Sequence, residues 1–190
     1  MSEDEESDET LMARVAAGDE RAFARLAERH SGRMLRLAQR TLGSAAEADE
    51  VAQEALLRVW QHARRFRPER ARLATWIYAI VYRLAIDRLR RPRTLPLELA
   101  MEIEDAAPDA LEAMSRASEL ARLAAAMATL QPRQRAALTL FYYDELEGAE
   151  AAAVLGVSLR AFWSLLHRAR QSLQQQMQVP AGLDVGTGTP

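Results

Sequence analysis

The stretch EGAEAAAVLGVSLRAFWSLLHRAR, residues 147–170, decides the fold of the C-terminal part of the chain. Its alanine-rich beginning, 147–155, predicts a short helix that ends at Gly156, and Ser158 is placed to cap a longer helix. Two helices joined by so short a turn are typical of a helix-turn-helix, although an ordinary pair of packed helices shows the same pattern. The sequence therefore predicts a helix-turn-helix, with its second helix facing DNA.

This second helix is amphipathic, which resolves the apparent conflict between its apolar residues and a role in DNA binding. Its apolar stripe comprises Phe162, Leu166, Ala169 and Leu173, with Leu165 at the edge. The opposite side carries the candidate DNA-contacting residues Arg160, Ser164, His167, Arg168 and Gln171. Trp163 lies at the margin, where it could either contact DNA or pack. We therefore predict that this helix both packs and reads DNA.

Helical periodicity also runs through most of residues 11–91, with breaks at Gly18, Gly43 and Pro68, and Thr75 is placed to cap the last helix. No strand pattern is present. We predict an all-α protein with two small helical domains joined by a flexible acidic linker, the second being the helix-turn-helix domain. The expected divisions are an acidic disordered tail at 1–10, domains at 11–92 and 112–177, a linker at 93–111 and a disordered tail at 178–190.

Charge is strongly segregated along the chain, although the net charge is only −2. Residues 58–93 contain eleven arginines and two acids, which favours nucleic-acid binding over a merely solvated helical face. Arginines there interleave with Trp76, Tyr78 and Tyr82. Arginines can hold phosphates while aromatic rings stack on unpaired bases, so this combination suits single-stranded DNA. For Trp76, packing in the core is the better explanation of most of the ring.

Other classes of protein are disfavoured by the composition. The chain has no cysteine, no apolar run long enough to span a bilayer, and an acidic rather than signal-like N-terminus, so we expect a cytoplasmic protein. Its three histidines lie far apart in sequence, and no phosphate-binding loop or nucleophile motif is present. We predict no catalytic activity, no metal site, no cofactor and no small-molecule substrate.

An acidic and amide face occurs in EADEVAQEALLRVW, residues 47–60. Glu50, Gln53 and Glu54 share one side of the predicted helix, with Asp49 beside them. Such a face could bind arginines of a partner helix, but taken alone a solvated surface is the better explanation of these charges.

Taken together and in order, these motifs resemble the extracytoplasmic-function (ECF) sigma factors of bacterial RNA polymerase. The resemblance covers about residues 10–177 and rests on these stretches: LMARVAAGDERAFARL, EADEVAQEALLRVW, RFRPER, TWIYAI, LAIDRLRR, LQPRQRAALTLFYYDEL, LGVS and HRAR. It implies an alternative sigma factor that binds core polymerase, recognises the −35 and −10 promoter elements and promotes DNA melting. It also implies regulation by an anti-sigma factor, which in this family is often a membrane-anchored protein.

The resemblance assigns roles to three sets of residues. Binding to the polymerase clamp helices falls to Asp49, Glu50, Gln53 and Glu54. Capture of −10 DNA falls to Arg67, Arg70, Arg72, Trp76, Tyr82, Arg83, Arg90 and Arg91. Docking on the polymerase flap falls to the second domain, which reads the −35 element through Arg160, Trp163, Ser164, His167, Arg168 and Gln171.

The chain departs from the family pattern at several positions. Relatives usually carry glycine at Ala71, serine or threonine at Glu147, and lysine or arginine at Trp163 and Leu165. Two alternatives therefore remain open: a helix-turn-helix regulator that does not bind core polymerase, and a sigma-like decoy.

Overall fold

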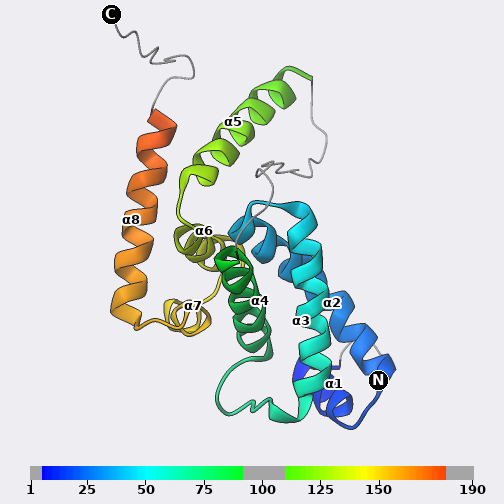
Figure 1. Cartoon of the computed structure of the whole chain (residues 1–190). Helices are drawn as coiled ribbons and strands as arrows, with labels where there is room; N and C mark the ends of the chain where they lie inside the picture. The colour runs from blue at the N-terminus through cyan, green and yellow to red at the C-terminus, as the bar shows by residue number, and fades with distance from the viewer. Residues whose placement is uncertain (1–5, 92–109, 179–190) are drawn as a thin grey trace, which may run out of the picture.

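The computed structural model describes residues 6–91 and 110–178, and all regular structure in these ranges is helical (Figure 1). The predicted all-α class is confirmed. The elements are α1 (Asp8–Ala16), α2 (Glu20–Leu42), α3 (Ala45–His62), η2 (Ala63–Arg65), α4 (Leu73–Arg90), α5 (Ala110–Thr129), α6 (Pro132–Leu138), η3 (Thr139–Tyr143), α7 (Gly148–Leu155) and α8 (Leu159–Gln178). Nearly all of the predicted linker and C-terminal tail, and the first half of the N-terminal tail, lie outside the described residues.

The N-terminal unit, α1–α4, owes its helix boundaries to local capping. Asp19 accepts hydrogen bonds from the backbone N–H groups of Arg21 (2.9 Å) and Ala22 (3.1 Å), which fixes the start of α2. The same helix ends at Gly43, whose φ of 76° is a left-handed conformation that favours glycine. Ser44 then caps α3. The turns predicted at Gly18 and Gly43 are thus confirmed.

Helices α2, α3 and α4 pack on one another and α1 closes one end of the bundle (Figure 1). Their facing sides are apolar and form the core, with fully buried residues such as Leu26, Leu37, Ala55, Ile77 and Val81. The apolar stripes read from the sequence therefore face inward, as amphipathic helices require.

The start of α4 differs from the prediction. Thr75 does not cap the helix, which already begins at Leu73 with Arg72 at the N-cap position. Leu73 is only 1% exposed, so its burial in the core favours an earlier start although Arg72 supplies no side-chain cap. Thr75 is buried inside the first turn, and its hydroxyl donates to Oε1 of Glu150 at 3.3 Å.

The C-terminal unit, α5–α8, contains the predicted helix-turn-helix. Helix α6 begins with Pro132, as expected for proline at a first helical position. Helix α7 ends at Gly156 with a φ of 66°, and α8 leaves it at an angle of 93°. This angle falls in the range typical of a helix-turn-helix.

The two units lie against each other, with α7 on α4 and α6 on α2 (Figure 1). Helices α5 and α8 pack together and project away from this contact. Within the described ranges no single helix is long and apolar enough to cross a membrane, although the bent pair α7 and α8 meets these criteria when taken together.

Candidate nucleic-acid and polymerase interfaces

Helix α8 separates its packing and exposed sides as predicted. Ser158 accepts a hydrogen bond from the backbone N–H of Ala161 at 3.2 Å and so caps the helix. The side chains of Phe162, Leu166 and Ala169 are buried. All six candidate −35 residues are exposed: Arg160, Trp163, Ser164, His167, Arg168 and Gln171. The exposed side is continuous and polar apart from Leu159 and Trp163, so it can meet a DNA groove.

Trp163 packs and remains 44% exposed. Its ring meets Phe141 and Phe162 edge to face, with centroids 5.4 and 5.3 Å away. The ring also covers Gly148 so closely that a Cβ atom there would lie 2.5 Å from its Cζ2 atom. Trp163 therefore sets how the start of α7 meets α8, and its outer edge remains free to contact DNA.

The start of α7 explains how Glu147 replaces the usual serine or threonine. The side chain of Glu150 accepts a hydrogen bond from the backbone N–H of Glu147 at 3.3 Å, and the Glu147 side chain caps the third residue of the helix. This reciprocal pair is a capping box, so the departure preserves the start of the helix.

The predicted −10 residues divide into an exposed set and a covered one. The exposed set is Arg67, Arg70, Arg72, Arg83, Arg90 and Arg91. Trp76 is half-buried with its ring 5.6 Å from that of Phe66, which agrees with a mainly structural role for the indole. An arginine-rich surface thus surrounds α4 and the loop before it.

Tyr82 differs from the expectation of a ring free to stack on a base, because it is only 4% exposed. Burial raises the pKa of its hydroxyl, and the guanidinium of Arg133 in α6 lies close enough to oppose this rise. The C-terminal unit therefore contributes to the surroundings of Tyr82. The periodicity of α4 alone could not reveal this proximity of Tyr82 to Arg133, a residue of another helix.

The acidic face of α3 presents Asp49, Glu50, Gln53 and Glu54, and all four are exposed. Two of the carboxylates meet arginines of the chain itself. Glu50 pairs with Arg88 of α4, and Glu54 accepts from Arg58 at 2.9 Å. These pairs are exposed and therefore weak, so an arginine of a partner can replace them.

An apolar groove of about 440 Å³ borders this face, and no motif in the sequence indicated it. Its lining comprises Glu20, Phe23, Gln53, Leu56, Leu57 and Trp60. Leu57 is a large apolar residue outside the buried stripe of α3, and it is 50% exposed. Its position in the sequence was the available signal of this groove. The acidic face and the groove share Gln53 and form one continuous surface.

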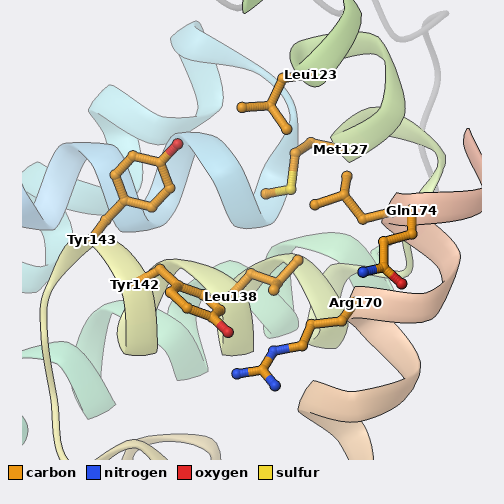
Figure 2. Close-up of a pocket in the computed structure, with 8 residues that line it drawn as sticks. Leu123, Met127, Leu138, Tyr142, Tyr143, Arg170 and Gln174 are labelled. Atoms are coloured by element: carbon orange, nitrogen blue, oxygen red, sulfur yellow. The ribbon is translucent and has the colours of Figure 1, made fainter. Parts of the chain in front are cut away.

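A second apolar groove lies between α5, η3 and α8, with a volume of about 590 Å³ (Figure 2). It is lined by Leu123, Met127, Leu138, Tyr142, Tyr143, Arg170, Leu173 and Gln174. Tyr142 and Tyr143 are about half exposed, and the guanidinium of Arg170 lies 5.3 Å from the ring centroid of Tyr142. An apolar floor with such a polar rim suits an amphipathic helix. The lining residues come from separate helices, so sequence patterns did not reveal this groove.

In the described parts of the chain, no group of three histidine, aspartate or glutamate side chains could hold a metal ion. The features present are surfaces for macromolecules: an arginine-rich face, the polar face of a helix-turn-helix, and two apolar grooves.

Two protein-family models match the chain. Sigma-70 region 2 matches residues 26–94, and Sigma-70, region 4 matches residues 120–173. The first match covers most of the N-terminal unit, and the second covers the helix-turn-helix with the helices before it.

Full-length relatives and solved structures agree with these matches. The ECF RNA polymerase sigma factor RpoE of Cereibacter sphaeroides is 34% identical over 84% of this chain and 88% of its own length. The RNA polymerase sigma factor CnrH of Cupriavidus metallidurans is 32% identical over 89% of this chain and 93% of its own. A structure of CnrH in complex with the cytosolic domain of CnrY superposes with a TM-score of 0.66, at 26% identity and over 90% of this chain and 96% of that chain. The sigma factor RpoE of Bartonella quintana, at 20% identity over 83% of this chain and 98% of its own, shares the fold with a TM-score of 0.67. The region matches and these relatives show that the chain belongs to the family of ECF RNA polymerase sigma factors.

Proposed function

We propose that this ECF sigma factor binds core polymerase through α3, captures melted −10 DNA with the arginine-rich surface around α4, and reads the −35 element with α8. The observation that carries the proposal is the polar outer face of α8 on a helix-turn-helix, in the same chain as the acidic face and groove of α3. A regulator that only binds DNA has no need of the second surface. The functional domains are residues 11–92 and 112–177.

The acidic face of α3 and the apolar groove beside it are the proposed surface for the polymerase clamp helices. Carboxylates at Asp49, Glu50 and Glu54 offer partners for arginines, while Leu57 and Trp60 offer an apolar anchor. Such a mixture of charged rim and apolar centre is typical of protein interfaces.

The −10 and −35 surfaces supply binding energy for promoter melting rather than chemistry. Exposed arginines along 67–91 neutralise phosphates, and the half-buried ring of Trp76 offers an aromatic surface for an unstacked base. Tyr82 is buried in this structure and would have to be uncovered to do the same. On α8, Arg160, Arg168 and Gln171 can donate to base edges or phosphates. RNA synthesis itself belongs to the polymerase, and the protein acts with it in the cytoplasm.

The groove between α5, η3 and α8 (Figure 2) is the proposed docking place for the polymerase flap, and an anti-sigma factor would compete for such surfaces. CnrH bound to the cytosolic domain of CnrY supports a protein partner of this kind, which includes a membrane-anchored one.

The test is run-off transcription from genomic promoter fragments by bacterial core polymerase mixed with the purified chain. We expect specific transcripts. If the chain does not bind core polymerase, the sigma-factor function is refuted and the alternative of a helix-turn-helix regulator remains. If it binds core polymerase without initiating transcription, the result would favour a sigma-like decoy.

A charge reversal tests the assignment of the α3 face. Glu54→Arg is expected to weaken core binding at least tenfold, because it places a cation against an arginine-binding surface, with an unchanged circular dichroism spectrum. Glu28→Arg, an exposed reversal on α2, is the matched control and is expected to bind core normally. Equal affinities for the two variants would remove the clamp assignment.

A further inference from the structure

Helix α8 carries a small apolar patch at the start of its outer face. The patch consists of Leu159 and Trp163, which are 46% and 44% exposed and lie side by side because they are spaced i, i+4. We propose that this apolar patch reads the C5-methyl groups of thymines in the major groove of the −35 element. The inference rests on the proposed function and deepens it, because it names a base that the element must contain.

The surfaces proposed for protein partners do not account for the exposure of this patch. Among the described residues, the other exposed large apolar side chains are Leu57, Tyr142 and Tyr143, and each of them lines one of the two apolar grooves. Leu159 and Trp163 line neither groove. Two adjacent apolar side chains left in water on one helix face mark a contact surface rather than scattered exposure.

The apolar patch lies where a helix-turn-helix meets the edges of base pairs. Leu159 is the first residue of α8, directly after the turn at Gly156 and the capping residue Ser158. In this motif the N-terminal residues of the second helix contact bases in the major groove. Trp163 follows one helical turn later, so both side chains belong to the part of α8 that the motif places against base edges.

Polar and basic groups beside the apolar patch favour DNA as its partner. Arg160, Ser164 and His167 are exposed on the adjoining side of α8. The helix contains no acidic residue, so no side chain of α8 repels the phosphates that flank a base pair. Among the four bases, thymine alone presents a methyl group in the major groove, and an apolar side chain is the group that recognises it.

The indole of Trp163 is held in place before DNA binds. Its inner side meets the rings of Phe141 and Phe162 edge to face and covers Gly148. A side chain that is already fixed loses little conformational freedom on binding, so less of its contact free energy is spent on ordering. The exposed edge of the indole is therefore a preorganised apolar contact, and Leu159 adds a second one a turn earlier.

The spacing of the two side chains predicts the spacing of the thymines. Residues at i and i+4 of a helix have Cβ atoms about 5 to 6 Å apart. Successive base pairs of a duplex are about 3.4 Å apart along its axis. One thymine under each side chain therefore places the two methyl groups about one or two base-pair steps apart. We expect the −35 element to contain such a pair of thymines, on the same strand or on opposite strands.

The test removes methyl groups from the DNA without changing its sequence. Duplexes with a random centre are bound to the full chain, alone and together with core polymerase, and the bound duplexes are sequenced. Each selected duplex is then amplified with either dTTP or dUTP, because uracil pairs as thymine does but lacks the C5-methyl group. Band-shift titrations compare the affinities of the native chain for the two forms of each duplex.

A substitution in the apolar patch tests whether the methyl effect arises there. Leu159→Ala removes most of one side chain of the patch and keeps a residue that favours the helix. The matched control is Gln175→Ala, a change to alanine at an exposed position of the same helix, far from the patch. Urea denaturation verifies that both variants fold, and the comparison of the two DNA forms on the native chain does not depend on any variant.

We expect the native chain and Gln175→Ala to bind the thymine form about fourfold more tightly than the uracil form for each methyl group in contact, because burial of one such group adds about this much affinity. In Leu159→Ala the ratio of the two affinities is expected to fall by about the same factor. Equal affinities of the native chain for the two forms, or an unchanged ratio in Leu159→Ala, would overturn the proposal.

Binding to core polymerase is scored separately by gel filtration. A chain that distinguishes thymine from uracil through Leu159 but never binds core polymerase would refute the proposed function and leave the reading of methyl groups standing. A chain that binds core polymerase and initiates transcription equally well on both forms of its promoter would leave the proposed function standing and overturn the reading of methyl groups.

Discussion

Gly148 and Trp163 offer a sharp test of how the helix-turn-helix is held together. A Cβ atom at Gly148 would lie 2.5 Å from Cζ2 of Trp163 and 3.1 Å from two further ring atoms. Overpacking of this kind costs about 1 to 3 kcal/mol. Alanine in a helix otherwise gains about 0.5 to 1 kcal/mol over glycine, and Gly148 does not have a positive φ, so alanine can adopt its backbone conformation.

These opposing effects predict a change of sign. Gly148→Ala alone is expected to lower the free energy of unfolding by about 1 kcal/mol, because the steric clash outweighs the gain in helix propensity. In the Trp163→Ala background the ring is gone, and the same substitution is expected to raise the free energy of unfolding by about 0.5 to 1 kcal/mol. The expected coupling between the two sites is therefore about 2 kcal/mol.

Urea denaturation followed by circular dichroism measures all four members of this cycle. Gly32→Ala is the matched control, because Gly32 is an exposed residue within α2 and its added Cβ would meet only the flexible end of Arg36, at 3.5 Å. It is expected to stabilise the chain in both backgrounds. If Gly148→Ala shifts stability in the same direction with and without Trp163, the tryptophan does not set the position of α7.

Two further predictions concern pH and DNA. Burial raises the pKa of Asp144 to about 6 from an ordinary value of 3.8, although three arginines of α2 oppose the rise. The folded chain therefore takes up a proton before the unfolded chain does, and Asp144 contributes stability that grows as the pH falls from about 6 to about 4. The full difference between the folded and ordinary pKa values of Asp144 corresponds to about 3 kcal/mol in the free energy of unfolding. We expect a contribution of about 1 to 2 kcal/mol, because Asp144 keeps some contact with solvent. Relative to Asp144→Asn, the native chain should therefore gain stability as the pH falls through this range, measured as denaturation midpoints. Identical pH profiles for the two proteins would contradict the assignment. On α8, Arg168→Ala is expected to weaken holoenzyme binding to a −35 fragment about tenfold, whereas the exposed Gln175→Ala should not, as band-shift titrations would show.

The helix-turn-helix could be predicted because its determinants are local. Gly156 permits the left-handed turn, Ser158 caps the next helix, and the stripe through Phe162 and Leu166 repeats at helical spacing. The start of α4 could not be predicted in the same way. Thr75 is the better capping residue, but burial of Leu73 against distant helices prevails.

The candidate interfaces also divide into features with local determinants and features that depend on packing between distant residues. The exposed residues of α3 and α8 follow from periodicity alone, because each face belongs to a single helix. The groove of Figure 2 needs Leu123, Tyr142 and Arg170 side by side, and they are brought together only by the packing of α5, η3 and α8. Likewise, the covering of Tyr82 depends on Arg133, some fifty residues later in the chain.

Arg135 makes the association of the two units easy to reverse. Besides its bonds to the backbone carbonyls of Arg40 (2.7 Å) and Thr41 (2.8 Å) at the end of α2, it donates to the carbonyls of Leu130 (2.6 Å) and Ala128 (3.3 Å) within its own unit. When the units separate, these internal bonds can persist, while the carbonyls of Arg40 and Thr41 turn to water. Exchanging a protein hydrogen bond for one with water changes the free energy by only about 0.5 to 1.5 kcal/mol. At this arginine, separation of the two units would therefore leave only polar groups that water can satisfy, and no helix would have to unfold.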